Sequence, residues 1–276
     1  MKPSVPPYKT VAVASTFSPR FLHVLAEAKR IRERLGSELN LIYVGERDPK
    51  TLGKFADVLA QLKLPAESPI HFHQGDPASA ILKAIDAHQV NLIVAGALEK
   101  EVVLRPFLGN VARRLVRESK CSVMLFTKPE IEPKPLRRIV FLADYSEHAR
   151  EALRKVLHLA TLEDAERVYV IRLHTTFDEA RAARRRSSPG KACDGARTLE
   201  EEEVALEEFV LSVGETDAPV EARCVRGNTS YAASDFVQSV EADLLAIPAA
   251  GKFGDDFSGH LAWITEVIPC ALWIIR

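Results

Sequence analysis

The residues best placed for chemistry follow short apolar runs in the sequence. Thr16 and Asp144 end two such runs, and Gly75, Gly96 and Gly227 follow others. If these runs are strands of an open parallel sheet, their carboxyl ends meet at one edge, where such sheets bind ligands. The positions therefore predict a binding site, although Asp144 is equally suited to capping the following helix, and Gly96 to a tight turn.

No arrangement typical of a conventional enzyme occurs in the sequence. Ser15, Ser18 and Ser146 have no histidine partner that the sequence identifies, and there is no paired-carboxylate pattern or Gly-Lys-Ser/Thr phosphate loop. His71 and His73 share one face of an expected strand, but without a third ligand they predict no metal site. We therefore predict a binding or regulatory protein with no catalytic residues.

The cysteine spacing and the hydropathy of the chain indicate in which cellular compartment we expect the protein. Cys121, Cys193, Cys224 and Cys270 form no CxxC pair and fit no zinc spacing, so we expect reduced structural thiols. No run of about 18 apolar residues is present, and the first residues lack the apolar core of a secretion signal. We expect a cytoplasmic protein that has no contact with a membrane.

The length and net charge of the chain limit the number of domains and the kinds of partner that we expect. The 276 residues are 47% apolar, which is typical of a globular protein long enough for two domains. Lys and Arg number 37 against 38 Asp and Glu, for a net charge of −1. Because the chain as a whole is not basic, we expect no nucleic-acid partner.

The sequence repeats one pattern twice. Residues 8–18 and 136–146 are both apolar runs that end in an aromatic-Ser pair, and helical spacing of apolar residues follows each. Further matched runs occur at 39–44 and 167–173, 70–74 and 220–225, 91–96 and 243–248, and 122–126 and 271–275. Strands that alternate with helices in this way predict right-handed βαβ units. We therefore predict an α/β protein made of two tandem, open, parallel-sheet, Rossmann-like domains.

The boundaries of these domains follow from the linker between the repeats. We predict a first domain at 1–128, a proline-rich linker at 129–135 and a second domain at 136–276. The second domain has an insert at about 179–203, which includes Arg181, Arg184, Arg185 and Arg186 and ends in four glutamates. We expect a solvated loop there, followed by a helix to about Ser212. The alternative is a docking patch for an acidic partner or for nucleic acid. Deleting residues 181–197 should abolish partner capture under that alternative and leave nucleotide binding intact under the others.

The order of these motifs resembles the universal stress protein family. A strand ending at Gly96, a loop of about a dozen residues, Leu108-Gly109-Asn110, an amphipathic helix, a cysteine and a final apolar strand follow the family's order. The resemblance covers nearly the whole chain, twice. It implies a role in the stress response and a pseudo-dimer within one chain, in which strands 122–126 and 271–275 pair and Trp263 and Trp273 lie near the interface. It leaves a further homodimer open.

The family also implies where a nucleotide would bind. Many members bind ATP through Gly-x2-Gly-x9-Gly-Ser/Thr together with an Asp that ends the first strand. Carried onto this chain, the implied nucleotide-binding positions are Thr16, Val44, Gly96, Gly109, Asn110, Asp144, Gly251 and Gly259. The cofactor so implied is ATP, ADP or AMP, with Mg²⁺ if it is ATP.

Each half departs from this pattern. In the first half, Glu99 replaces a glycine and Thr16 replaces the Asp. A carboxylate ~4 Å from a phosphate charge costs ~4 kcal/mol at an effective dielectric constant of ~20, so we expect weak or absent ATP binding there. The second half keeps Asp144, but Pro248 replaces the first glycine and removes an amide donor. We therefore expect the second half to favour AMP or another ligand with few phosphates.

Two other functions stay open. The first is an ATP-binding protein with slow hydrolysis or switch behaviour, which would make the chain at most a weak ATPase. The second is a scaffold that docks a protein partner through the Arg181–Arg186 region.

Overall fold

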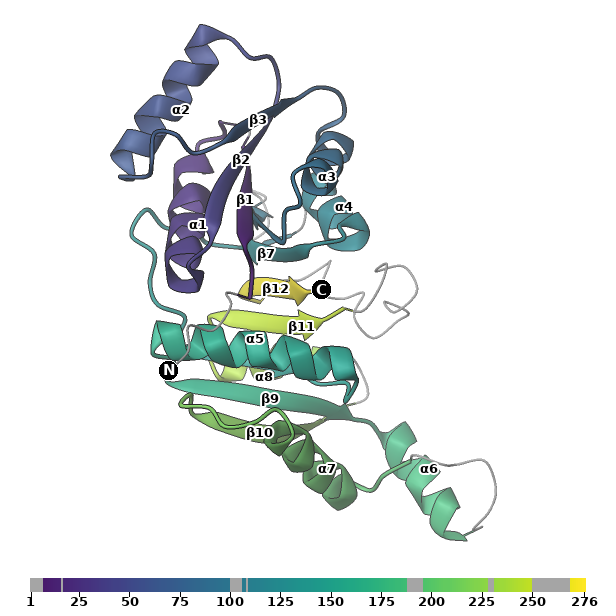
Figure 1. Cartoon of the computed structure of the whole chain (residues 1–276). Coiled ribbons are helices and arrows are strands. Elements are labelled where there is room, and N and C mark those ends of the chain that lie inside the picture. Colours follow the sequence, from purple (N-terminus) through teal and green to yellow (C-terminus); the bar gives the residue numbers. More distant parts are fainter. Residues whose placement is uncertain are drawn as a thin grey trace.

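The computed structural model describes residues 7–15, 17–99, 106, 107, 109–187, 196–227, 231–249 and 269–276 (Figure 1). The first half of the chain contains β1 (Thr10–Ser15), α1 (Phe21–Leu35), β2 (Glu38–Val44), α2 (Pro49–Gln61), β3 (Ile70–His73), α3 (Pro77–Ala87), β4 (Leu92–Gly96), the short β5 (Leu98–Glu99) and β6 (Pro106–Phe107), α4 (Asn110–Glu118) and β7 (Ser122–Phe126).

Up to its fourth strand the described second half follows the same order, with one additional helix between its second and third strands. It contains β8 (Arg138–Leu142), α5 (Glu147–Glu163), β9 (Arg167–His174), α6 (Thr176–Ser187), α7 (Leu199–Leu211), β10 (Val220–Arg226), α8 (Tyr231–Ser239), β11 (Leu244–Pro248) and β12 (Ala271–Ile275). None of the helices that the structure describes is long and apolar enough to cross a membrane.

A single sheet of ten strands runs through both halves in the order β10-β9-β8-β11-β12-β7-β4-β1-β2-β3. Neighbouring strands are parallel within each half, and the third, second, first, fourth and last strands follow one another in the same order. The predicted α/β fold of two tandem parallel sheets is therefore confirmed.

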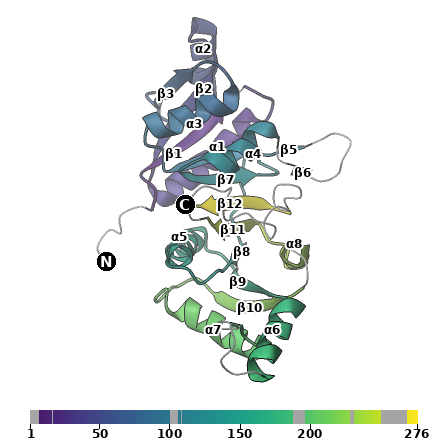
Figure 2. The same cartoon turned by 90° about the vertical axis from the view of Figure 1, so that its right-hand side faces the viewer.

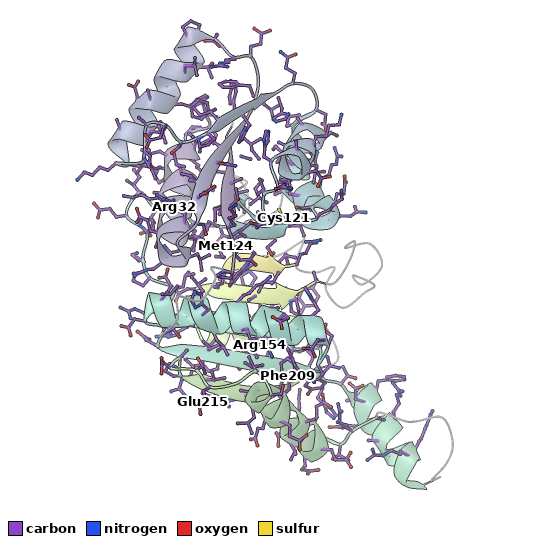
Figure 3. All side chains as sticks on the ribbon, in the orientation of Figure 1. Arg32, Cys121, Met124, Arg154, Phe209 and Glu215 are labelled. Atoms are coloured by element: carbon purple, nitrogen blue, oxygen red, sulfur yellow. The ribbon has the colours of Figure 1, made fainter. Side chains whose placement is uncertain are left out.

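The two halves meet through their last strands. β7 and β12 lie side by side (Figure 1) and pair in antiparallel fashion. Trp273 lies opposite Met124, which Figure 3 labels, and Ile274 lies opposite Val123. Trp273 is fully buried there, as expected for a residue at the junction, whereas Trp263 lies outside the described residues. This pairing covers two strand edges that would otherwise be open to intermolecular association.

Helices cover both faces of the sheet. Buried side chains from α1, α2, α5 and α7 pack on one face, and those from α3, α4 and α8 pack on the other (Figure 2). Both apolar clusters include residues from the two halves, so the core continues across the junction. The fully buried strands read as nearly unbroken apolar runs for this reason.

Three histidines lie together near the outer edge of the first half. The rings of His71 and His88 stack with centroids 3.5 Å apart, and His73 lies 5.7 Å from His88. Burial, together with the nearby imidazoles of His88 and His73, lowers the pKa of His71 below its usual value, and burial also lowers that of His88. Among the described residues, no group of His, Cys, Asp and Glu has the geometry of a metal site.

These histidines predict a loss of stability in mild acid. Because the pKa values of His71 and His88 are lowered on folding, the unfolded chain binds protons more readily, and the free energy of unfolding falls as the pH drops through about 6.5. Urea unfolding at about pH 7.5 and about pH 5.5 should show a smaller loss for His88→Gln than for the unmodified chain. His158→Gln, a histidine of α5 outside the cluster, is the control; equal losses for the two variants would contradict the prediction.

Candidate functional site

A pocket of about 570 Å³ opens at the carboxyl ends of the second-half strands. It is lined by residues that end or follow β8, β9, β10 and β11, and by the first turns of α6. Strand order reverses at β8, which lies between β9 and β11, so the pocket occupies the switch point where open parallel sheets bind ligands. Its volume is in the range of small-molecule sites.

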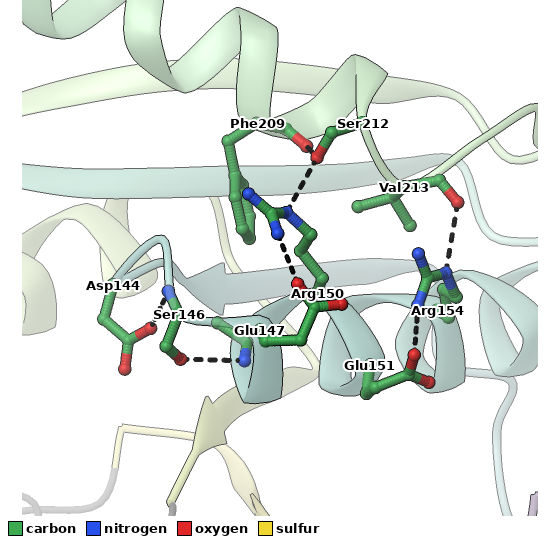
Figure 4. Close-up of polar contacts among 10 residues, drawn as sticks. Asp144, Ser146, Glu147, Arg150, Glu151, Arg154, Phe209, Ser212 and Val213 are labelled. Atoms are coloured by element: carbon green, nitrogen blue, oxygen red, sulfur yellow. Dashed lines mark hydrogen bonds and ion pairs between the residues drawn. The ribbon is translucent and has the colours of Figure 1, made fainter.

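Asp144, the predicted ligand contact, lies in this pocket. Its side chain is exposed, and its Oδ1 accepts a hydrogen bond of 2.9 Å from the backbone amide of Ser146 (Figure 4). Ser146 itself caps α5, because its hydroxyl accepts from the amide of Ala149 at 3.0 Å. The two predicted roles of Asp144, a ligand contact and a cap at the turn before the helix, are therefore compatible. The carboxylate closes the turn and still faces the pocket.

The turn after β8 has an unusual backbone that repeats in the first half. Tyr145 has a φ of 63° and Phe17 a φ of 50°, both in the left-handed region that few residues other than glycine adopt. These are the two aromatic residues of the repeated aromatic-Ser pair. Packing holds each in place: Phe17 lies 4.6 Å from Phe55 between ring centroids, and Tyr145 lies 5.5 Å from Phe209.

Behind the pocket, the buried carboxylate of Glu202 holds several side chains of the pocket wall in position. Glu202 of α7 accepts a 2.7 Å hydrogen bond from the Tyr145 hydroxyl and a 3.2 Å hydrogen bond from Nε of Arg172. Arg197 pairs with its other oxygen at 3.5 Å. Burial and the adjacent carboxylate raise the pKa of Tyr145, so this phenol stays protonated and remains a donor. Arg172, a residue of β9 that lines the pocket, is thereby held in one orientation.

The inserted segment forms a wall of the pocket. Residues 176–187 fold as α6, so the expectation of a solvated loop, which began at about residue 179, is wrong for 179–187. The predicted helix up to about Ser212 is confirmed by α7. Phe177, Asp178 and Arg181 of α6 line the pocket. Of these, Arg181 lies in the segment whose deletion is expected to leave ligand binding intact, and that expectation stays a prediction.

A reciprocal pair of hydrogen bonds fixes where α6 begins. The Asp178 carboxylate accepts from the amide and hydroxyl of Thr175, at 2.9 and 2.7 Å, and the Asp178 amide donates to the Thr175 hydroxyl at 3.2 Å. This is the geometry of a capping box. Further along the insert, Arg185 pairs with Glu201 of α7 at 2.5 Å, which neutralises one of its five arginines. The proposal that this region docks a partner stays a prediction.

The structure places the predicted first-half residues in two groups. Val44 and Gly96 end β2 and β4, and Gly109 and Asn110 begin α4. A Cβ on Gly96 would lie 2.9 Å from a methyl group of Val24, so tight packing against α1 accounts for this glycine. The equivalent of Val44 in the second half is Leu173, which has the matching register with its neighbouring strand and lines the pocket.

Three of the predicted site residues, Thr16, Gly251 and Gly259, lie outside the described residues. They and the first-half positions stay predictions. Arg172, Leu173, Phe177 and Arg181 are pocket residues that the sequence analysis did not assign to a ligand site. Of the cysteines, Cys121 and Cys270 are buried free thiols whose pKa is raised by burial, in keeping with a packing role, and Cys193 is not described.

Comparison with known proteins identifies the family. The sequence model of the universal stress protein family matches residues 50–127. A universal stress protein of Thermus aquaticus, encoded in the QAH/OAS sulfhydrylase 3' region, is 28% identical over 135 residues, which are 43% of this chain and 98% of that protein. Residues 50–127 belong to the universal stress protein family.

Other universal stress proteins bear this out. A relative from Methanocaldococcus jannaschii is 26% identical over 147 residues, which cover 45% of this chain and 85% of that protein. The crystal structure of a universal stress protein from Archaeoglobus fulgidus has the same fold over 97% of this chain and 98% of its own, with a TM-score of 0.67 and 14% identity. The shared fold therefore extends over both halves, whereas the matched family sequence model lies in the first.

Proposed function

We propose that this universal stress protein is a non-enzymatic stress-response module that binds a nucleoside or nucleoside monophosphate in its second half. The observation that carries the proposal is the carboxylate of Asp144 in a pocket of about 570 Å³ at the switch point of the sheet. A carboxylate can accept hydrogen bonds from ribose hydroxyls or from an exocyclic amine. The pocket's apolar side chains, Leu142, Leu173 and Ile247, would contact the base.

The lining favours a ligand with few phosphates. Pro248 ends β11 at the pocket and has no amide hydrogen to offer a phosphate oxygen. Asp144 and Asp178 place two carboxylates among the lining residues. The carboxylate of Asp178 stays ionised, because hydrogen bonds from Thr175 lower its pKa against the opposing effect of burial. A triphosphate with four negative charges would be repelled more strongly than a monophosphate.

We also propose that the chain is organised as a first domain at 1–128, a linker at 129–135 and a second domain at 136–276. The identical strand order on either side of the β7–β12 pair supports this division. It makes the chain a pseudo-dimer in which only the second domain carries the proposed nucleotide site.

Calorimetric titration tests the proposed site. We expect AMP to bind the unmodified chain, and Asp144→Ala to weaken binding by about tenfold or more, because a charge-assisted hydrogen bond contributes about 1.5–3 kcal/mol. Asp217→Ala is the matched control, since Asp217 is an exposed aspartate just before β10, at the opposite end of that strand from the pocket. Its affinity should equal that of the unmodified chain.

The outcome against the proposal is equally definite. If a folded chain takes up neither AMP nor adenosine at millimolar concentrations, the second-half pocket is not a nucleotide site. ATP binding tighter than AMP binding, with Mg²⁺ present, would instead favour the ATP-switch alternative.

A further inference from the structure

The additional helix α6 brings a cation to the pocket. Arg181 lies on the wall, and its guanidinium carbon is 5.8 Å from the centre of the Phe177 ring, within the range of a cation–π contact. Across the parts of the chain that the structure describes, this guanidinium has no carboxylate partner. Other arginines of this region are paired, Arg185 with Glu201 and Arg197 with Glu202. Arg181 therefore keeps its charge available to a ligand.

A second guanidinium on the same wall is held rigidly. Arg172 donates through Nε to Glu202 at 3.2 Å and through Nη1 to the carbonyl oxygen of Ala143 at 3.1 Å, and it lies over the Tyr145 ring at 5.2 Å. Its side chain is still 38% exposed, and it lines the pocket. With two of its nitrogens engaged, the guanidinium is oriented before any ligand arrives, which lowers the entropic cost of binding.

Phosphate binding by these two arginine side chains would differ from the usual arrangement at the edge of a parallel sheet. Backbone amides at a glycine-rich loop serve that purpose in many α/β proteins. Here Pro248 lacks an amide hydrogen at the end of β11, and the cations come from β9 and from a helix that has no counterpart in the first half. A phosphate monoester carries about two negative charges, and guanidinium groups bind it through charge-assisted hydrogen bonds.

We infer that α6 is the anion-recognition element of this pocket: Arg181, together with Arg172, binds the phosphate of a nucleoside monophosphate. This inference rests on the proposed function and adds to it the group that distinguishes a nucleotide from a nucleoside. Phe177 acts as a positioning residue, because its ring, 67% exposed, supports the Arg181 guanidinium. A helix in the segment for which the sequence predicts a solvated loop thus selects the small ligand.

The test compares AMP, adenosine and inorganic phosphate by calorimetry on the full chain. We expect AMP to bind at least about tenfold more tightly than adenosine or phosphate alone. Arg181→Gln should weaken AMP binding about 10- to 100-fold and leave adenosine binding unchanged, because only the phosphate loses a partner. Arg184→Gln is the matched control: it makes the same change in charge on an exposed residue of the same helix that does not line the pocket.

The possible results separate this inference from the proposed function. If AMP and adenosine bind equally well, or if Arg181→Gln weakens both alike, the role of α6 is overturned while the nucleoside pocket stands. If neither ligand binds, both proposals fail. Equal thermal unfolding midpoints for the two glutamine variants show that a loss of AMP binding does not come from unfolding. Phe177→Leu should reduce AMP affinity by a smaller factor than Arg181→Gln, again with adenosine binding unchanged.

Discussion

Replacing Glu163 by alanine is expected to lower the free energy of unfolding by about 3–5 kcal/mol. Glu163 lies near the end of α5, and its side chain is completely buried against the other half of the chain. One carboxylate oxygen accepts a 2.6 Å hydrogen bond from Arg30 of α1, and the other accepts from the amide of Leu136 at 3.1 Å. Without this carboxylate, Arg30, only 11% exposed, loses its closest partner in a site that water scarcely reaches.

The remaining partner of Arg30 cannot compensate. Glu27, one turn earlier on α1, pairs with Arg30 at 3.0 Å, but burial raises the pKa of Glu27 and so weakens its anionic form. Glu163→Ala would also leave the Leu136 amide without its acceptor at the start of the second half. Because these contacts join α1 to α5, we expect the loss to appear as weaker coupling between the halves.

Urea unfolding measures this effect, with Glu151→Ala as the control. Glu151 is on the same helix, but its side chain is 60% exposed, and its ion pair with Arg154 should be worth less than 1 kcal/mol. A change for Glu163→Ala no larger than that of the control would show that the buried pair does not hold the halves together.

The strands and the repeat of the fold could be predicted because buried strands have a recognisable pattern of apolar residues in the sequence. A strand covered by helices on both faces needs apolar residues at nearly every position, as in Leu92–Gly96 and Leu244–Pro248. The position of Asp144 at the carboxyl end of a strand could also be predicted, because the aromatic-Ser pair marks where the first strand of each half ends. The pairing of β7 with β12 was expected from the family resemblance, since no local pattern encodes which edges pair, and the structure adds that the two strands are antiparallel.

Helix α6 was missed for a different reason. Its residues are so polar that they suggest a solvated loop, yet alanine and arginine, which fill much of the segment, are strong helix formers. Thr175 and Asp178 also have the spacing of a capping box, a local signal that would have predicted where the helix begins. Its position at the pocket could not be predicted, because it depends on the direction in which the chain leaves β9.

The other large effect is expected from Glu202, whose replacement by alanine should cost about 2–3 kcal/mol of stability and also weaken ligand binding. Glu202 is buried and joins three partners: the Tyr145 hydroxyl and the guanidinium groups of Arg172 and Arg197. We place the loss below that of Glu163→Ala because Arg172 and Arg197 are 38% and 40% exposed and regain some hydration. The half-buried Tyr145 loses the acceptor of its hydroxyl hydrogen bond.

The effect on binding follows from the freedom that Arg172 would gain. Without Glu202, the contacts that Arg172 keeps among the described residues are the Ala143 carbonyl and the face of Tyr145, so its orientation toward the pocket is no longer fixed. We expect Glu202→Ala to lower AMP affinity by several-fold, with the loss in the entropy of binding, whereas Glu203→Ala, the exposed neighbour on α7, should change neither stability nor affinity. Glu202→Gln can still accept the hydrogen bonds of Tyr145 and Arg172, and it should recover part of both losses. If Glu202→Ala lowered stability and left AMP affinity unchanged, Glu202 would be a structural residue only, and Arg172 would not depend on it for its place in the site.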